Sequence, residues 1–171
     1  MSELTQVEQD ELWMKHALAL ADKAEAMGEV PVGALIVLNN KIIGEGYNRS
    51  IIDNDPCAHA EIMAIQSAAK CIDNYRILDA TIYVTLEPCA MCAGAIVHAR
   101  LKRAVFGASD LKTGCAGSIL NLLQHDKLNH QVEVQRGILA GECSDKISVF
   151  FKGRRAQIKA RKQANREAQQ D

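Results

Sequence analysis

Two short segments of the chain carry side chains that suit metal-assisted chemistry. The first contains His59 and Glu61, and the second contains Cys89 and Cys92. A structural zinc site is usually closed by four protein ligands, whereas a catalytic site has three and keeps one position for water. His59, Cys89 and Cys92 supply three ligands, and Glu61 supplies a carboxylate that the metal does not need. This set predicts an activated water molecule with a proton acceptor beside it.

The charge of the ligand set indicates what Glu61 does. Two thiolates and a neutral imidazole balance the charge of Zn²⁺, so the metal is a weaker acid than zinc held by three histidines. We therefore expect Glu61 to accept the proton of the water and to deliver it to the leaving group. Each residue alone favours a simpler interpretation: a core histidine, a redox Cys-x-x-Cys, or a carboxylate at a helix start. The four together favour the metal site.

The elements that must position these residues can be read from the hydrophobic pattern. Thr5 to Glu8 fits a capping box, and Trp13, Ala17, Leu20, Ala21, Ala24 and Met27 follow at helical spacing up to a stop at Gly28. Residues 32–38 and 41–47 predict a hairpin that turns at Asn39-Asn40. Helices are expected over residues 58–69 and 88–99, the second with Pro88 in its first position.

The remaining elements complete an alternating order of strands and helices. Strands are predicted over residues 81–86, 103–107 and 132–134, a short helix capped by Ser118 over residues 118–123, and a last helix from about Leu139. Two strand–helix–strand units imply a parallel portion behind the hairpin. We therefore expect an α/β fold with three layers, α/β/α, around a mixed sheet of about five strands.

Composition and charge limit the classes to which the chain can belong. Its 171 residues are 48% hydrophobic and 24% charged, which is typical of one soluble globular domain spanning residues 1–171. No stretch is apolar enough for a signal peptide or a membrane span, so the expected compartment is the cytoplasm. Reduced thiols are then expected, and Cys57, Cys71, Cys115 and Cys143 are interpreted as core or loop residues.

The net charge of −1 conceals a division between the two ends of the chain. Residues 1–30 hold seven acidic and two basic side chains, whereas residues 152–171 hold seven basic and two acidic ones. A basic tail on a near-neutral protein suits contact with phosphates, although a solvated helix with a frayed end would have the same composition. We expect the tail to be partly disordered after about residue 156.

The residues that surround the four functional side chains form a more specific pattern than the ligand set alone. The segments 29–34, 59–64, 83–95, 106–108, 112–114 and 117–118, together with Asn48 and Asp110, resemble the bacterial tRNA-specific adenosine deaminases of the cytidine deaminase-like superfamily. The same zinc ligands and glutamate are described for the wider superfamily. The resemblance runs in order from about Trp13 to Arg155.

That resemblance implies a reaction, a cofactor and partners. The reaction is zinc-dependent hydrolysis of adenosine to inosine at the wobble position of a tRNA, usually an arginine tRNA, by a homodimer with one Zn²⁺ per subunit. His59, Cys89 and Cys92 match the family's zinc ligands and Glu61 its proton shuttle. Residues matching the family's contacts to the anticodon stem-loop are Asn48, Asp110, Phe150, Phe151 and Arg154.

Two other functions remain open at this point. A deaminase of free guanine or cytidine would share the zinc site but would have no use for a phosphate-binding surface. A non-catalytic zinc module that binds RNA would not need Glu61. The basic tail and the loop at residues 106–118 favour a polynucleotide substrate.

Overall fold

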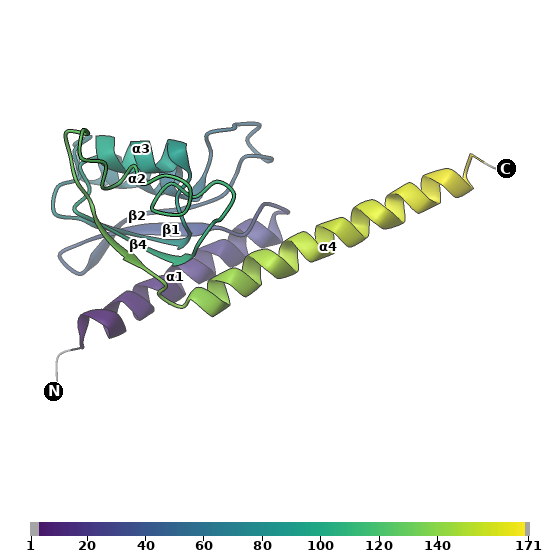
Figure 1. Cartoon of the computed structure of the whole chain (residues 1–171), viewed down its shortest axis with the longest axis horizontal. Helices are drawn as coiled ribbons and strands as arrows, with labels where there is room; N and C mark the ends of the chain where they lie inside the picture. Colours follow the sequence, from purple (N-terminus) through teal and green to yellow (C-terminus); the bar gives the residue numbers. More distant parts are fainter. Residues whose placement is uncertain (1–3, 170–171) are drawn as a thin grey trace.

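A mixed sheet of five strands lies between two pairs of helices in this computed structural model, which describes residues 4–169 (Figure 1). The spatial order of its strands is β2 (Lys41–Tyr47), β1 (Gly33–Leu38), β3 (Thr81–Leu86), β4 (Arg103–Ala108) and β5 (Glu133–Arg136). β1 is antiparallel to both of its neighbours, whereas β3, β4 and β5 are parallel. The predicted α/β class, its three layers and the mixed five-stranded sheet are confirmed.

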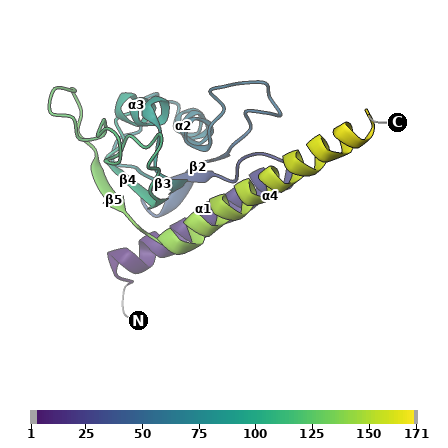
Figure 2. The same cartoon turned by 45° about the vertical axis from the view of Figure 1, so that its right-hand side comes forward.

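The helices cover both faces of the sheet. Figure 2 shows α2 (Ala60–Cys71) and α3 (Ala90–His98) together on one face, and α1 (Gln6–Ala26) and α4 (Ala140–Glu167) on the other. Two apolar clusters fill the two interfaces, with Ile36 and Ile82 in the first and Leu35 and Tyr83 in the second. Successive strand residues point to opposite faces, which explains why neighbouring residues belong to different clusters.

Local sequence signals explain where several elements begin and end. Thr5 caps α1 and forms the expected capping box with Glu8, and Gly28 adopts the left-handed backbone that follows the helix. Asn39 and Asn40 both have positive φ, as the tight turn of the hairpin requires. The predicted apolar face of α1 needs one correction, because Met14 is fully buried while Met27 is exposed.

A buried ion pair ties α1 to the sheet. Both carboxylate oxygens of Asp10 accept hydrogen bonds of 2.7 Å from Arg103, and the Tyr83 hydroxyl donates to Asp10 at 2.8 Å. Burial disfavours the charged carboxylate, but these donors outweigh burial and lower the pKa of Asp10. The sheet and α1 therefore form one unit on the face opposite α2 and α3.

Two predicted helix details are wrong. Pro88 precedes α3 rather than opening it, because Cys89 is the N-cap. Residues 118–123 form turns and an isolated bridge rather than a helix. Ser118 does not cap a helix because both its backbone N–H and its hydroxyl donate to the carboxylate of Glu87.

The outer half of α4 extends far beyond the rest of the molecule (Figure 1). α4 continues to Glu167, and residues 151–169 are all exposed. The structure therefore describes a helix where we expected a partly disordered tail after about residue 156. Fraying of this segment in solution stays a prediction, which amide hydrogen exchange would test. Across residues 4–169, no helix has the length and apolar character needed to cross a membrane.

Candidate active site

The N-terminal ends of α2 and α3 meet at one point and bring the three expected ligands together. His59 is the N-cap of α2 and Cys89 is the N-cap of α3, and Cys92 lies one turn further along α3. The Nδ1 atom of His59 is 3.7 Å from Sγ of Cys89 and 3.6 Å from Sγ of Cys92. The three ligand atoms all lie within 4.8 Å of one another, so this group can hold a metal ion.

The pKa values of the two thiols indicate that a cation would stabilise this cluster. Hydrogen bonds from the Cys92 thiol and from His59 lower the pKa of Cys89 to about 4. The pKa of Cys92 is raised, because its thiol donates to Cys89 and is buried. One thiolate thus forms readily, while a second negative charge beside it is costly. A divalent cation between the two sulfur atoms would offset that cost.

Glu61 lies beside this cluster with its carboxyl group buried. It occupies the first turn of α2, two residues after His59, and its residue surface is only 4% exposed. Burial is the main reason that the pKa of Glu61 rises to about 7, and the negative charge of Cys89 adds to the effect. A carboxyl group with this pKa can both accept and donate a proton at neutral pH.

Asn48 connects the end of the hairpin to the start of α2. Its side-chain Oδ1 accepts a hydrogen bond of 2.9 Å from the backbone N–H of Ala60. This bond fixes the direction of the amide and leaves its NH₂ group available as a donor. Because Asn48 also lines the cavity described next, that donor is available to a ligand.

A cavity of about 670 Å³ opens over the cluster and has the size of a typical ligand site. His59, Glu61 and Cys89 line one side of the cavity, and the inner part of α4 lines another side. The complete lining is Val30, Val32, Asn48, His59, Glu61, Leu86, Glu87, Cys89, Ser109, Asp110, Leu111, Lys112, Thr113, Ile147, Ser148, Phe151 and Arg155. Acid–base groups and a potential metal site therefore share one cavity with an aromatic ring and an arginine.

The loop between β4 and residue 118 is held in place by Glu87. The Glu87 carboxylate accepts hydrogen bonds from the backbone N–H groups of Asp110 at 2.9 Å, Ala116 at 3.1 Å and Ser118 at 3.0 Å. Burial opposes ionisation, yet these donors and the Ser118 hydroxyl lower the pKa of Glu87. A Cβ atom at Gly114 would lie 2.4 Å from Cδ of Glu87, so only glycine fits there. Glu87 thus shapes one wall of the cavity.

Of the other residues expected to contact RNA, two line the cavity and two do not. Asp110 lines it, but its carboxylate already accepts hydrogen bonds from Lys112 and Thr113. Phe151 lines the cavity and is 42% exposed. Phe150 and Arg154 are not lining residues: the Phe150 ring contacts Phe151 edge-on at 5.5 Å, and Arg154 lies 5.8 Å from the Phe150 centroid.

The remaining cysteines do not join the ligand group. Cys115 and Cys143 are buried, whereas Cys57 and Cys71 are exposed. In the part of the chain that the structure describes, His59, Cys89 and Cys92 are the one group of three or more potential ligands close enough to share an ion. The cavity is therefore the candidate active site.

Comparisons with known proteins agree with this geometry. The MafB19-like deaminase family matches residues 8–155. A tRNA-specific adenosine deaminase of Haemophilus influenzae is 58% identical over 154 residues, which cover 90% of this chain and 89% of the relative. The chain belongs to the tRNA-specific adenosine deaminase family.

Solved structures place this family member among related deaminases. A chain from a study of A-to-I editing by tRNA:A34 deaminases at the wobble position of transfer RNA has a TM-score of 0.76 and 38% identity, covering 79% of this chain and 98% of that one. A guanine deaminase from Bacillus subtilis is 42% identical with a TM-score of 0.56, covering 58% of this chain and 64% of that one. The tRNA deaminase thus matches more of the fold.

The cavity of this deaminase is also lined by residues to which the sequence motifs assigned no role. Glu87 belongs to the segment 83–95 that carries the resemblance, but it had no role of its own there; its one local signal was a charge directly after an apolar strand, a position where a charge needs partners. Leu111 and Ile147 line the cavity from elements far apart in the chain. Their contribution depends on how the loop folds back and how α4 packs, and neither leaves a spacing signal in the sequence.

Proposed function

We propose that the protein hydrolyses adenosine to inosine and ammonia at the wobble position of a tRNA, an arginine tRNA by the resemblance. Membership of the tRNA-specific adenosine deaminase family supports the substrate. The observation that carries the proposal is the buried carboxyl of Glu61 next to three metal-ligand atoms, in a cavity that also contains Phe151 and Arg155.

Zinc is the metal that fits this donor set best. Two thiols and one imidazole suit Zn²⁺, whereas oxygen-rich sets suit Mg²⁺ or Ca²⁺. Standard zinc–sulfur and zinc–nitrogen bond lengths in a tetrahedral site put the nitrogen and sulfur atoms about 3.6 Å apart. His59 Nδ1 lies 3.7 and 3.6 Å from the two sulfur atoms. When bound, one Zn²⁺ per subunit would supply Lewis-acid activation of water.

Glu61 moves the protons of the reaction. Its carboxylate accepts a proton as the oxygen of water adds to C6 of the adenine ring. The protonated carboxyl then donates to N1. Glu61 next takes the proton of the hydroxyl now bonded to C6 and passes it to the C6 amine, which leaves as ammonia while the C6 carbonyl forms. Burial keeps bulk water away from Glu61, so the proton that Glu61 accepts can be passed on to the ring and to the amine.

The rest of the cavity orients the base and its flanking nucleotides. The free NH₂ of Asn48 is available to donate to an acceptor on the base, while its Oδ1 stays bonded to Ala60. Phe151 offers an exposed ring for base stacking, and Arg155 offers a cation for phosphate at the cavity edge. Asp110, Phe150 and Arg154 would contact the part of the anticodon loop that surrounds the target base.

Homodimerisation and a cytoplasmic location complete the proposal. Exposed apolar side chains, among them Ile119 and Leu120 in the segment between β4 and β5, offer a surface that a second copy could cover. A tRNA substrate favours the cytoplasm. Sedimentation equilibrium of the purified protein would test the dimer, and a monomer at micromolar concentration would contradict it.

A substrate panel separates this proposal from its alternatives. The protein would be mixed with adenosine, cytidine, guanine and a tRNA anticodon stem-loop, and the products would be identified by mass spectrometry. We expect inosine in the stem-loop and little conversion of the free compounds. Rapid conversion of guanine or cytidine, with an unchanged stem-loop, would support a nucleobase deaminase instead. No conversion of any substrate by the zinc-loaded protein would support a non-catalytic zinc module.

A further inference from the structure

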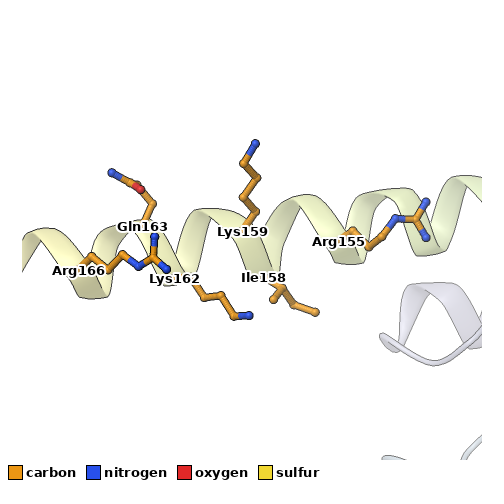
Figure 3. Close-up of a pocket in the computed structure, with 6 residues that line it drawn as sticks. All are labelled: Arg155, Ile158, Lys159, Lys162, Gln163 and Arg166. Carbon is orange, nitrogen blue, oxygen red and sulfur yellow. The ribbon is translucent and has the colours of Figure 1, made fainter.

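Four basic side chains form a line along the outer part of α4, which we call the basic stripe: Arg155, Lys159, Lys162 and Arg166. Their spacing of four, three and four residues places them on one face of the helix. Figure 3 shows this face, with Lys159 and Lys162 extending to either side of the helix between Arg155 and Arg166. At 1.5 Å per residue, the stripe is about 16 Å long.

The stripe is exposed and is not neutralised by the protein. All four residues are exposed, and none takes part in an ion pair within residues 4–169. The nearby acid Glu167 instead accepts a hydrogen bond from Gln163. Like charges three and four residues apart repel one another in an isolated helix. A polyanion along this face would relieve that repulsion.

Arg155 connects the stripe to the candidate active site. It lines the active-site cavity and also the shallow surface depression that the other three stripe residues share. The stripe therefore starts at the edge of the cavity and leads away from the body of the protein along the projecting helix (Figure 1). A ligand in contact with the whole stripe must therefore span about 16 Å from the edge of the cavity outward.

We infer that the basic stripe binds the phosphate backbone of the base-paired stem next to the loop that carries the target adenosine. This inference rests on the proposed function and deepens it. Duplex nucleic acid carries about one negative charge per 1.7 Å of axis, which is more than enough to match four cations over this length. A free nucleobase is too small to reach the outer residues of the stripe.

Salt dependence distinguishes phosphate contacts from other roles. We would measure kcat and KM for deamination of two stem-loops at several salt concentrations. One has ordinary phosphates throughout, and the other has the same loop but neutral methylphosphonates in the stem. The variant carries Lys159→Gln, Lys162→Gln and Arg166→Gln, which keep helix propensity nearly constant. Arg155 is left unchanged because it lines the cavity.

On the ordinary stem-loop we expect the triple variant to raise KM without lowering kcat. The slope of log kcat/KM against log salt should become shallower by about two to three, at roughly 0.7 to 0.9 per lost phosphate contact. On the neutral stem, the wild type and the variant should behave alike. An unchanged slope on the ordinary stem, or an equal loss on both RNAs, would overturn the inference.

A matched pair of single substitutions separates position from net charge. Lys162→Gln and Arg161→Gln each remove one positive charge at neighbouring positions, but Arg161 lies on the opposite side of α4 from the stripe. We expect only Lys162→Gln to make the slope shallower, by about 0.7 to 0.9. Equal effects of the two substitutions would overturn the inference.

The experiment also separates this inference from the proposed function. If the wild type forms inosine and the triple variant keeps the wild-type slope of log kcat/KM against log salt, the role of the stripe is rejected and the proposed function stands. If the wild type forms no inosine, the proposed function itself is rejected. Sedimentation equilibrium of the triple variant tests whether a second copy of the protein, rather than RNA, covers the stripe. Loss of self-association there would overturn the assignment to RNA, whereas an unchanged oligomeric state supports it.

Discussion

The metal-ligand cluster and the outer half of α4 represent two opposite environments in one chain. Around His59, Cys89 and Cys92 the side chains are half-buried or buried and held by two helix ends, whereas residues 151–169 are exposed throughout. Bond making and breaking needs fixed, water-poor surroundings, because electrostatic effects are strong there. Binding to phosphates instead uses solvated charges whose effects add along a surface.

This difference determines what a substitution should change in each region. Substitutions in the cluster should affect kcat or metal content, with little dependence on salt. Substitutions that remove a charge from the outer helix should affect KM and its salt dependence, with little change in kcat. A single substitution that changed both kcat and the salt dependence of KM would weaken that separation.

The largest effect is expected from Cys92→Ala. The variant loses one of three ligands from a buried position, so it should lose its metal and, with it, measurable turnover. Elemental analysis after dialysis and an inosine assay would check both. Cys71→Ala is the matched control, because Cys71 is exposed and outside the cluster. Full activity in metal-free Cys92→Ala would contradict the assignment.

A smaller effect is expected from Glu87→Gln, which keeps the shape of the side chain but removes its charge. The loop over residues 109–118 would lose charge-assisted hydrogen bonds worth about 1.5–3 kcal/mol, which corresponds to a 10- to 100-fold lower kcat/KM. The metal should be retained, and amide exchange in the loop should be faster. Glu133→Gln, on the exposed start of β5, is the control. Unchanged loop exchange would show that Glu87 does not hold the loop.

Phe151→Ala should weaken RNA binding through lost stacking rather than lost charge. Since the Phe151 side chain is partly exposed, we expect about 1 kcal/mol, or a fivefold higher KM, at the low end for base–aromatic stacking. The slope against salt should stay the same. Phe150→Ala is the matched control, because Phe150 does not line the cavity. If Phe150→Ala had the greater effect on KM, the placement of the two rings would be wrong.

The smallest effect on activity is expected from Asp10→Asn, which lies outside both regions. Loss of the buried ion pair with Arg103 should lower the free energy of unfolding by about 2 kcal/mol, below the range for fully buried pairs because Arg103 is partly exposed. The pKa of Asp10 is lowered from 3.8, so the wild-type advantage should be present above that pH and disappear as the pH falls further. Urea unfolding at several pH values would measure it. A pH-independent difference would contradict the ionised pair.

The sequence predicted the parts of the structure that depend on local rules. The capping box at Thr5, the turn at Asn39 and Asn40 and the alternation of strands and helices follow from neighbouring residues, and the structure confirms them. The sequence also predicted that His59, Cys89 and Cys92 lie together, which the structure confirms, and their role as metal ligands stays a prediction. The spacing of Cys89 and Cys92 placed both on the same side of α3.

Features that depend on distant partners could not be predicted in the same way. Ser118 has the chemistry of a helix cap, but the carboxylate of Glu87, 31 residues earlier, binds its backbone N–H and hydroxyl instead. Phe150 and Phe151 were equivalent in the sequence, and only the packing of α4 decides that Phe151 lines the cavity. Charge alone also left the basic tail ambiguous, whereas the helix in the structure aligns four of its cations.

The role of Glu61 is tested most sharply by comparing the wild type with Glu61→Gln in two measurements on the same samples. One is the zinc content per chain, and the other is the single-turnover rate of inosine formation in an anticodon stem-loop. We expect one zinc per chain in both proteins and a rate that is about 10²- to 10⁴-fold lower in Glu61→Gln. Wild-type activity in the zinc-loaded Glu61→Gln protein would contradict the central claim that the buried carboxyl moves the protons.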